Sequence, residues 1–389
     1  MYPQMNPYHV VIYRGGTSKG IFIRRNELPA DPKQRDAVIR AIFGSPDPRQ
    51  IDGLGGADVL TSKLAIIGPP SRADADVDYT FAQVSFDTDL VDFGGNCGNI
   101  SAAVGPYAID EGLVQAVEPI TRVRIHQTNT NCILEAEVAV RDGKPCVEGD
   151  YTIAGVPGSG SEIKLDFRDT AGSTTGRVLP TGNPVDLIEV AGQGVFPVSI
   201  VDAGNVLVFI EAASLGLKGT ESCRVIEENQ ALMALIEQIR AHAAVRCGMA
   251  ATPAEATEKS AYVPFFAIVS KPADYLADDG KTEVCANAVD VVSRLYFMLH
   301  MHKTYPGTGT VATGAAARIP GTLVYQQLSA EARQKDLLRI GHPRGVINVE
   351  ARLEGESDGQ YRFARLAYSR TARRILEGTA YVRSSLLQK

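Results

Sequence analysis

Two stretches of this chain decide its fold, and they resemble each other. Residues 95–113 read GNCGNISAAVGPYAIDEGL, and residues 306–323 read PGTGTVATGAAARIPGTL. Each stretch begins with a glycine-rich turn and continues through small residues for about three helical turns. Small side chains over that length predict a helix with close neighbours on all sides, as at the centre of a wrapped sheet.

A second pair of similar stretches comes before the first pair in each half of the chain. Residues 15–23 (GGTSKGIFI) and 203–210 (AGNVLVFI) both place a glycine turn before an apolar strand. Two pseudo-equivalent domains, 1–184 and 185–369, joined within 179–186, are the simplest explanation. Chance similarity between common small residues is the alternative.

The remaining pattern predicts an α+β fold in which strands dominate. Apolar residues at helical spacing predict helices over 31–43, 225–245 and 285–300. A hairpin is expected over 374–382, turning at Glu377 and Gly378. Short apolar runs bounded by turn residues predict strands over 10–13, 20–23, 64–67, 79–86, 123–126, 134–140 and 206–210.

The composition excludes several classes of protein. The 389 residues are 44% hydrophobic and 22% charged, which excludes a coiled coil, a collagen-like chain and a mostly disordered one. With 39 Lys and Arg against 45 Asp and Glu, the net charge of −6 argues against a general nucleic-acid binder. The start of the chain has no signal-peptide pattern and no apolar run approaches about 18 residues, so we expect a cytoplasmic protein.

Cys97 stands out among the six cysteines, none of which forms a CxxC or zinc-finger pattern. It lies within Gly94-Gly95-Asn96-Cys97-Gly98-Asn99, directly before the small-residue helix. A helix start leaves amide N–H groups unpaired and carries partial positive charge, which stabilises a thiolate and can also hold a carboxylate. Cys97 is therefore a candidate acid/base group beside an anion site, with a buried structural cysteine as the alternative.

The second helix start lacks the thiol. Aligning the two turns places Pro306 opposite Cys97 and Thr308 opposite Asn99, so any proton transfer needs a different second group. Lys63 is the candidate, because a lysine at the inner end of a strand can act as a base when it is partly buried. A solvated surface lysine is the alternative.

Other motifs bear on cofactors and metals. The segment 14–20 (RGGTSKG) suits a small anion but is no Walker A motif, and 307–314 matches a dinucleotide fingerprint poorly, so ATP and NAD are not expected. His300 and His302 fit a helix end better than a metal site. The arginines near the C-terminus are either a solvated strand face or a source of positive potential for a site: Arg362, Arg365, Arg370, Arg373 and Arg374.

These motifs resemble a known family. The chain is similar over nearly its whole length to the 2-methylaconitate cis–trans isomerases and 3-methylitaconate Δ-isomerases, which share the diaminopimelate-epimerase-like fold. The residues that carry the resemblance are RGGTSKG (14–20), FGSPD (43–47), RQIDG (49–53), TSK (61–63), NCGN (96–99), LPTGN (179–183), AAARIPG (315–321), GHP (341–343) with Gly345, and RTARRILEG (370–378). Within the family, LTSKLAIIG (60–68), DVDYTFAQV (76–84) and residues 303–305 are most similar to the 3-methylitaconate branch.

The resemblance implies two strand-rich, barrel-like domains, each around a central helix, with the site in the cleft between them. It implies that the C-terminal strands, 370–389, return to the first domain, that Lys63 and Cys97 are the acid/base groups, that Ser18 lines the site, and that no cofactor or metal is needed. Together with the two helix starts it predicts a substrate-binding set, Gly16, Thr17, Ser18, Asn96, Gly98, Asn99, Gly307, Thr308, Gly309 and Thr310, with Arg14, Lys19, Lys303 and His342 as further candidates.

The expected activity is a 1,3-allylic proton shift on a small unsaturated di- or tricarboxylate, of the type that converts 3-methylitaconate to 2,3-dimethylmaleate. A 2-methylaconitate isomerase, a 4-oxalomesaconate tautomerase, an epimerase with one thiol and one amine, and a non-catalytic polycarboxylate-binding protein are the alternatives. Nucleic acid and membrane are not expected as partners, and a homo-oligomer is compatible with the sequence.

Overall fold

The computed structural model describes residues 4–93, 95–260, 263–357 and 359–386, and the chain forms two compact units. Unit 1 comprises Met1–Leu165 and Ser369–Lys389, and unit 2 comprises Asp166–Tyr368. Unit 1 ends before residue 184, where the sequence placed the boundary. The reason is that the intervening segment bonds to unit 2: the Gly172 N–H donates to the Asp202 carbonyl, and the Asp202 N–H donates to the Val178 carbonyl.

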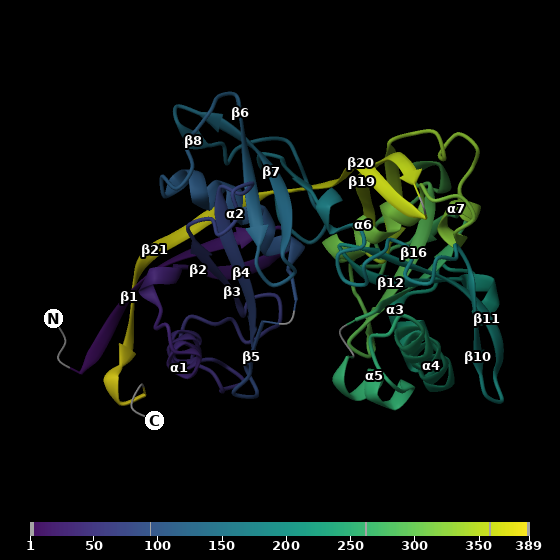
Figure 1. The fold of residues 1–389 in the computed structure, drawn as a ribbon, viewed down its shortest axis with the longest axis horizontal. Coiled ribbons are helices and arrows are strands. Elements are labelled where there is room, and N and C mark those ends of the chain that lie inside the picture. Colours follow the sequence, from purple (N-terminus) through teal and green to yellow (C-terminus); the bar gives the residue numbers. More distant parts are fainter. Residues whose placement is uncertain (1–3, 94, 261–262, 358, 387–389) are drawn as a thin grey trace. The chain divides into compact units, whose positions relative to one another are not determined.

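Unit 1 is built from strands that surround one helix. Helix α1 (Pro32–Phe43) lies on one side of the sheet and α2 (Gly98–Asp110) on the other (Figure 1). The strands in chain order are β1 (Met5–Gly15), β2 (Ser18–Arg24), β3 (Lys63–Gly68), β4 (Val77–Val84), β5 (Val91–Asp92), β6 (Ile120–Gln127), β7 (Cys132–Arg141), β8 (Lys144–Pro145), β9 (Ile163–Asp166) and β21 (Ala372–Arg383).

Unit 2 also combines strands with a buried helix and contains more helices than unit 1 among the described residues. Its strands are β10 (Asp186–Val190), β11 (Gly194–Ala203), β12 (Asn205–Glu211), β13 (Phe265–Ser270), β14 (Tyr275–Leu276), β15 (Glu283–Val284), β16 (Val291–Phe297), β17 (His300–Met301), β18 (Leu337–His342), β19 (Gly345–Ser357) and β20 (Gln360–Arg370). Its helices are α3 (Cys223–Glu228), α4 (Gln230–Arg246), α5 (Pro253–Lys259), α6 (Gly307–Ala316) and α7 (Leu323–Gln327).

The two units repeat one strand pattern. In unit 1 the neighbours run β21–β1–β2–β3–β4–β6–β7, and in unit 2 they run β10–β11–β12–β13–β16–β18–β19. In both rows the successive pairings are antiparallel, antiparallel, parallel, antiparallel, parallel and antiparallel. The α+β class and the repeat predicted from the two small-residue stretches are therefore confirmed.

The central helices explain why those stretches are small. Every residue of α2 from Ile100 to Ile109 is buried, and the helix contacts β1, β2, β3, β6, β7 and β21. Every residue of α6 is buried as well. Gly105 and Gly314 occupy the same turn of the two helices. A Cβ on Gly105 would lie 2.9 Å from Val138 Cγ2, and a Cβ on Gly314 would lie 2.9 Å from Val349 Cγ2.

Three local predictions were wrong. Residues 285–300 contain strand β16, not a helix. β16 lies between β13 and β18 and is buried on both faces, so apolar and polar residues do not alternate along it and its apolar residues happen to match helical spacing. The expected hairpin at Glu377 is instead part of the unbroken strand β21, which pairs with β1 from Ala372 to Arg383. The expected helix over 225–245 is two helices, since Asn229 ends α3 and its side chain caps α4.

Gly105→Ala tests the close packing of α2. Alanine favours a helix over glycine by about 1 kcal/mol, but here the new methyl group would overlap the buried Val138 side chain. We expect the variant to lower the free energy of unfolding by about 1–2 kcal/mol, measured by urea denaturation. In the double variant with Val138→Ala the loss should be smaller than the sum of the two single losses. A Gly105→Ala protein at least as stable as wild type would contradict this packing.

Candidate active site

Cys97 lies at the start of the buried helix of unit 1, as the sequence predicted. It is the N-cap residue of α2, with extended backbone angles (φ −116°, ψ 101°) and no side-chain cap hydrogen bond. Its carbonyl accepts hydrogen bonds from the Ser101 N–H at 2.9 Å and the Ser101 hydroxyl at 2.9 Å. The thiol is half-buried. The first-turn amides of α2 have no partner within the helix, so the thiol stands next to a group of anion-binding donors.

The glycines of segment 14–20 pack closely against the start of α2. A Cβ on Gly15 would lie 2.4 Å from the Asn99 carbonyl oxygen, so no side chain fits there. A Cβ on Gly20 would lie 2.8 Å from Ile100 Cδ1 and 3.1 Å from the Lys63 carbonyl oxygen. Gly20 is therefore flanked by α2 on one side and by the start of β3 on the other. This close approach brings the elements that carry Lys63 and Cys97 next to each other.

Lys63 is the first residue of β3 and is half-buried. Its Nζ donates to Gln83 Oε1 at 3.0 Å and lies 5.3 Å from the centroid of the Phe81 ring. The Gln83 amide is itself held, because its Nε2 donates to the carbonyls of Ser62 at 3.0 Å and Val59 at 3.2 Å. The amine is therefore positioned by a neighbouring strand rather than extended into solvent.

A chain of hydrogen bonds joins the glycine turn, the helix start and the C-terminal part of unit 1. Arg370 Nε donates to Asn99 Oδ1 at 3.1 Å, and Asn99 Nδ2 donates to Thr17 Oγ1 at 2.8 Å. Arg370 is only 5% exposed. Of the two roles left open for the C-terminal arginines, Arg370 fits a source of positive potential, whereas Arg374 pairs with Glu111 and Glu377.

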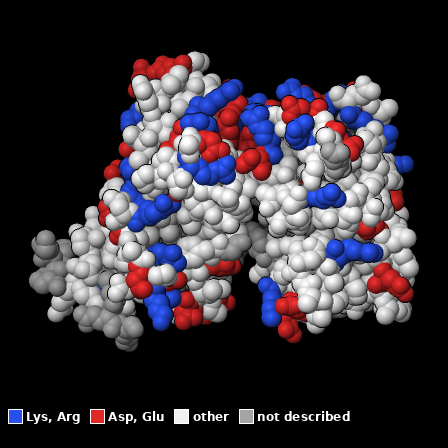
Figure 2. All heavy atoms as spheres, in the orientation of Figure 1, with Lys and Arg blue, Asp and Glu red and all other residues white. Residues whose placement is uncertain are grey.

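Arg14 adds a second guanidinium beside the same turn. Its Nη1 donates to the carbonyls of Gly16 and Thr371, each at 2.9 Å. Burial and the nearby charge of Arg373 lower the pKa of the Arg14 guanidinium from its ordinary value. An anion bound near Gly16 would reduce that repulsion. Elsewhere, charges of both signs are mixed on the faces of both units that Figure 2 shows.

The other predicted residues of unit 1 lie in the same two segments. Ser18 is 2% exposed and its hydroxyl has no hydrogen-bond partner among the described residues. Asn96 is buried and its Oδ1 accepts from the Ser101 hydroxyl at 3.1 Å. Gly98 is the buried first residue of α2. The Lys19 N–H donates to the Leu60 carbonyl, and its side chain is half-buried. Gly94, in the same turn, lies outside the described residues.

Unit 2 carries the corresponding helix start without a thiol. Pro306 is the N-cap residue of α6, in the position that Cys97 holds in α2. Gly204 has φ +71°, and a Cβ there would lie 3.0 Å from the Thr308 carbonyl oxygen. Asn205 Nδ2 donates to Thr308 Oγ1 at 3.1 Å. The asparagine and threonine have thus exchanged places: unit 1 has asparagine on the helix and threonine on the turn.

The remaining predicted residues of unit 2 differ in whether their hydrogen-bond donors are already used within helix α6. The N–H and the hydroxyl of Thr310 both donate to the Pro306 carbonyl, at 2.9 Å each, so both donors are used within the helix. This leaves Thr308 and Gly309 as the candidates for anion binding there. Gly307 is buried, and a Cβ on it would overlap the Tyr368 side chain. Lys303 is exposed, and His342 is a buried residue at the end of β18.

The described histidines are not grouped with other metal ligands. His300 lies in the short strand β17, not at a helix end, and its Nδ1 is 3.7 Å from a Glu227 carboxylate oxygen. Among the described residues no group of three or more His, Cys, Asp and Glu is placed to hold a metal ion. No helix of the described chain is both long enough and apolar enough to cross a membrane.

Two residues of this arrangement were missed from the sequence. Gln83 was read only as part of a strand, and the polar residues around it in 77–86 (VDYTFAQVSF) gave no reason to single it out. Arg370 was seen in the arginine cluster but not separated from it. Its contact with Asn99 spans 271 positions of the chain, so sequence spacing could not reveal it.

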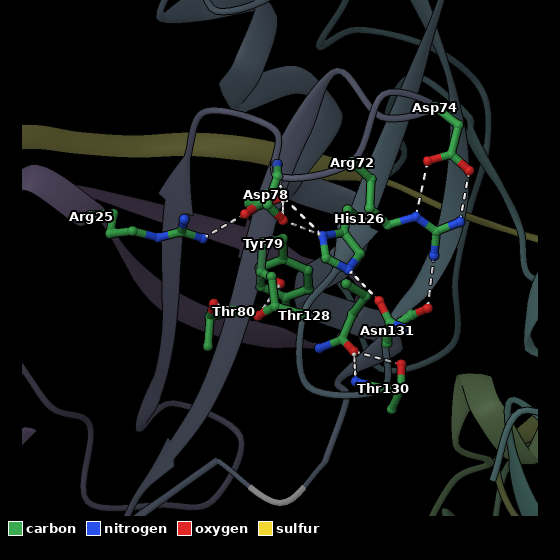
Figure 3. A network of polar contacts seen from close by, with 12 residues as sticks. Arg25, Arg72, Asp74, Asp78, Tyr79, Thr80, His126, Thr128, Thr130 and Asn131 are labelled. Atoms are coloured by element: carbon green, nitrogen blue, oxygen red, sulfur yellow. Dashed lines mark hydrogen bonds and ion pairs between the residues drawn. The ribbon is translucent and has the colours of Figure 1, made fainter.

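A separate buried network lies at the far end of β3 and β4 (Figure 3). Lys63 pairs with Gln83 at one end of these strands, and Gly68 pairs with Asp78 at the other. Asp78 is 1% exposed and accepts from the Ser71 N–H, the His126 ring and Arg25, each at 2.9 Å. Burial alone raises the pKa of the Asp78 carboxyl, but hydrogen bonds from Ser71, His126 and Arg25 outweigh it and hold the pKa below its usual value.

Comparison with known proteins gives consistent results over the full chain. The model of the family described as PrpF protein matches residues 5–383. The 3-methylitaconate isomerase of Eubacterium barkeri is 55% identical over 97% of this chain and 97% of that protein. The 2-methyl-aconitate isomerase of Shewanella oneidensis is 40% identical, again over 97% of each.

A solved structure agrees with these relatives. The crystal structure of a methylitaconate-delta-isomerase superposes with a TM-score of 0.89 at 54% identity, covering 99% of this chain and 97% of that one. A chain with this repeated fold and these relatives is an isomerase. It belongs to the PrpF protein family, which confirms the resemblance seen in the motifs.

Asp78→Asn tests the network at the far end of the strands. Because the folded-state pKa of Asp78 is depressed, its carboxylate stabilises the fold above the unfolded value of about 4, and this contribution is lost as the pH falls through the folded value. We expect Asp78→Asn to cost about 2–4 kcal/mol at pH 7, with a smaller difference from wild type near pH 3.

Urea denaturation at both pH values measures the effect, and Asp74→Asn is the matched control. Asp74 makes an exposed pair with Arg72, so its loss should cost less than about 1 kcal/mol. A cost for Asp78→Asn that does not change with pH would contradict this account of its charge.

Proposed function

We propose that this chain catalyses a 1,3-allylic proton shift that converts 3-methylitaconate to 2,3-dimethylmaleate. A base removes the hydrogen on C3, the carbon that carries the methyl group, and the electron pair of that bond forms the C2=C3 double bond. The electrons of the former C2=CH₂ bond take up a proton at the methylene carbon, which becomes a methyl group. One proton leaves and one returns, so substrate and product have the same composition.

The observation that carries this proposal is the unequal pair of helix starts. Unit 1 has Cys97 at the N-cap of its central helix, and unit 2 has Pro306 at the same place. A racemase that works with two facing thiols would need both, whereas an allylic shift needs one group to take a proton and one to return it. We assign the two proton transfers to Lys63 and Cys97, which lie on adjacent elements of unit 1.

Unit 1 also contains groups that can bind the substrate's carboxylates. The first-turn amides of α2, the buried Ser18 hydroxyl and the guanidinium groups of Arg14 and Arg370 gather around the glycine turn. Loss of the C3 proton places negative charge on a carboxylate oxygen of the substrate. Donors fixed where this charge develops lower the barrier, with one donor contributing about 10²–10³ in rate. Acid/base groups and oriented donors suffice for this shift, so the proposal includes no cofactor.

The test is turnover of a panel of unsaturated acids in D₂O, followed by ¹H NMR and ultraviolet absorbance. We expect 3-methylitaconate to react fastest, with deuterium in the newly formed methyl group. Faster reaction of 2-methylaconitate or 4-oxalomesaconate would keep the reaction type and change the substrate. Tight calorimetric binding without exchange would favour a binding protein, and inversion at a saturated carbon would favour an epimerase.

Lys63→Ala tests the proposed amine. Removing a positioned acid/base group lowers turnover by about 10²–10⁴, so we expect a loss in kcat of at least about a hundredfold. The melting temperature should change little, because Lys63 is half-buried and, among the described residues, its side chain donates one hydrogen bond, to Gln83. Lys33→Ala, an exposed lysine on α1, is the control and should keep wild-type turnover. Near-normal turnover of Lys63→Ala would refute the assignment.

A further inference from the structure

We propose that Arg370 is a positioning residue that acts through Asn99 to keep the Thr17 hydroxyl free to donate a hydrogen bond to the anionic substrate. This inference rests on the proposed function and specifies the recognition of the substrate's charge in that site. It gives the buried arginine of the C-terminal segment a role that the family resemblance does not assign.

The chemistry of the three groups fixes the direction of each hydrogen bond. A guanidinium can only donate, so the Asn99 atom that faces Arg370 Nε, at 3.1 Å, is the amide oxygen. The other end of the amide is then the NH₂ group, which can only donate, and it lies 2.8 Å from Thr17 Oγ1. Thr17 is therefore an acceptor in this contact, and its own O–H proton remains available.

Without Arg370, the direction of the hydrogen bond between Asn99 and Thr17 would not be defined. An asparagine amide can turn over and exchange the places of its oxygen and nitrogen. With the oxygen toward Thr17, the hydroxyl would donate to Asn99 and would have no proton left for a ligand. A charged donor that is 5% exposed makes the reversed amide costly, because the NH₂ group would then face the guanidinium.

The backbone around Thr17 limits any other arrangement. Gly16 has φ +51°, and a Cβ there would lie 2.2 Å from Asn99 Oδ1 and 3.1 Å from Arg370 Cδ. The absence of a side chain at Gly16 lets the turn bring Thr17 up to the amide. On its other side, Thr17 Cγ2 lies 3.6 Å from the position of a Cβ on Gly155. The methyl group thus faces the Gly155 turn while the oxygen faces Asn99.

Unit 2 has a similar contact with the partners exchanged. Asn205 Nδ2 donates to Thr308 Oγ1 at 3.1 Å. Among the described residues no arginine donates to the Asn205 amide, so the direction of this bond is not fixed as it is in unit 1. Unit 1 therefore presents the Thr17 hydroxyl as a donor beside the start of its central helix. A proton-donating hydroxyl at a helix start is suited to a carboxylate oxygen.

The decisive variant is Asn99→Asp, which is nearly isosteric and keeps an oxygen toward Arg370. A carboxylate can only accept, so Thr17 must now donate to it and loses its proton for the substrate. We expect kcat/KM for the substrate to fall by about 10- to 100-fold, the range for losing one hydrogen bond to a charged group, while the melting temperature holds. Thr17→Val should show a similar loss, and Thr17→Ser should retain most activity.

Two double variants separate a positioning role from a structural one. If all three residues act through one hydroxyl, Asn99→Asp adds no further loss in the Thr17→Val background, and neither does Arg370→Gln. A merely structural role predicts additive losses, and it predicts near-normal kcat/KM for Asn99→Asp, which retains its bond to Arg370. Either result would overturn the inference.

Turnover and binding together distinguish this inference from the proposed function. Kinetic constants are measured on whichever acid of the panel the wild type isomerises, and calorimetry measures the binding of 3-methylitaconate. Wild-type binding without turnover, together with weaker binding by Asn99→Asp, would reject the proposed reaction and keep the inference. Unchanged binding and turnover in Asn99→Asp would reject the inference alone, and a wild type that neither binds nor reacts would reject both.

Discussion

The contact between a glycine turn and the start of a buried helix is the constraint on which unit 1 depends. Gly15, Gly16 and Gly20 each face α2 at distances that leave no room for a side chain. Because the turn lies against the helix, the elements that carry the amine of Lys63 and the thiol of Cys97 become neighbours. The glycines that suggested an anion site from the sequence therefore have a packing role of their own, because they let the turn approach the helix start.

The corresponding elements of unit 2 separate the features that both units share from those that only unit 1 has. Both units keep the strand order, the buried helix, a glycine at the middle of that helix and an asparagine–threonine hydrogen bond at its start. Only unit 1 has a thiol at the N-cap, since Pro306 has neither a thiol nor an N–H to offer. The duplicated fold therefore carries an unequal pair of helix starts.

Local sequence was enough to predict the parts of the fold that local forces decide. The two small-residue helices, the glycine turns and most strands of unit 1 follow from side-chain size and apolar runs, and Asp31 caps α1 where the expected helix begins. Strand β16 was misread because a strand buried on both faces has no alternation to show. Gln83 and Arg370 contact the candidate site residues Lys63 and Asn99 because of how the strands pair and how the chain folds back. The spacing of residues along the sequence does not reveal such contacts.

The pairing of β1 with β21 has a consequence for how the protein is made. β1 is synthesised long before β21, the strand that covers its edge over the whole length from Met5 to Gly15. Unit 2 is one continuous stretch and is complete before that strand is synthesised. The edge of β1 therefore stays open while unit 2 is synthesised, and unpaired strand edges promote aggregation. Arg370 and Thr371 directly precede β21, so the candidate site is completed only after unit 2 has been synthesised.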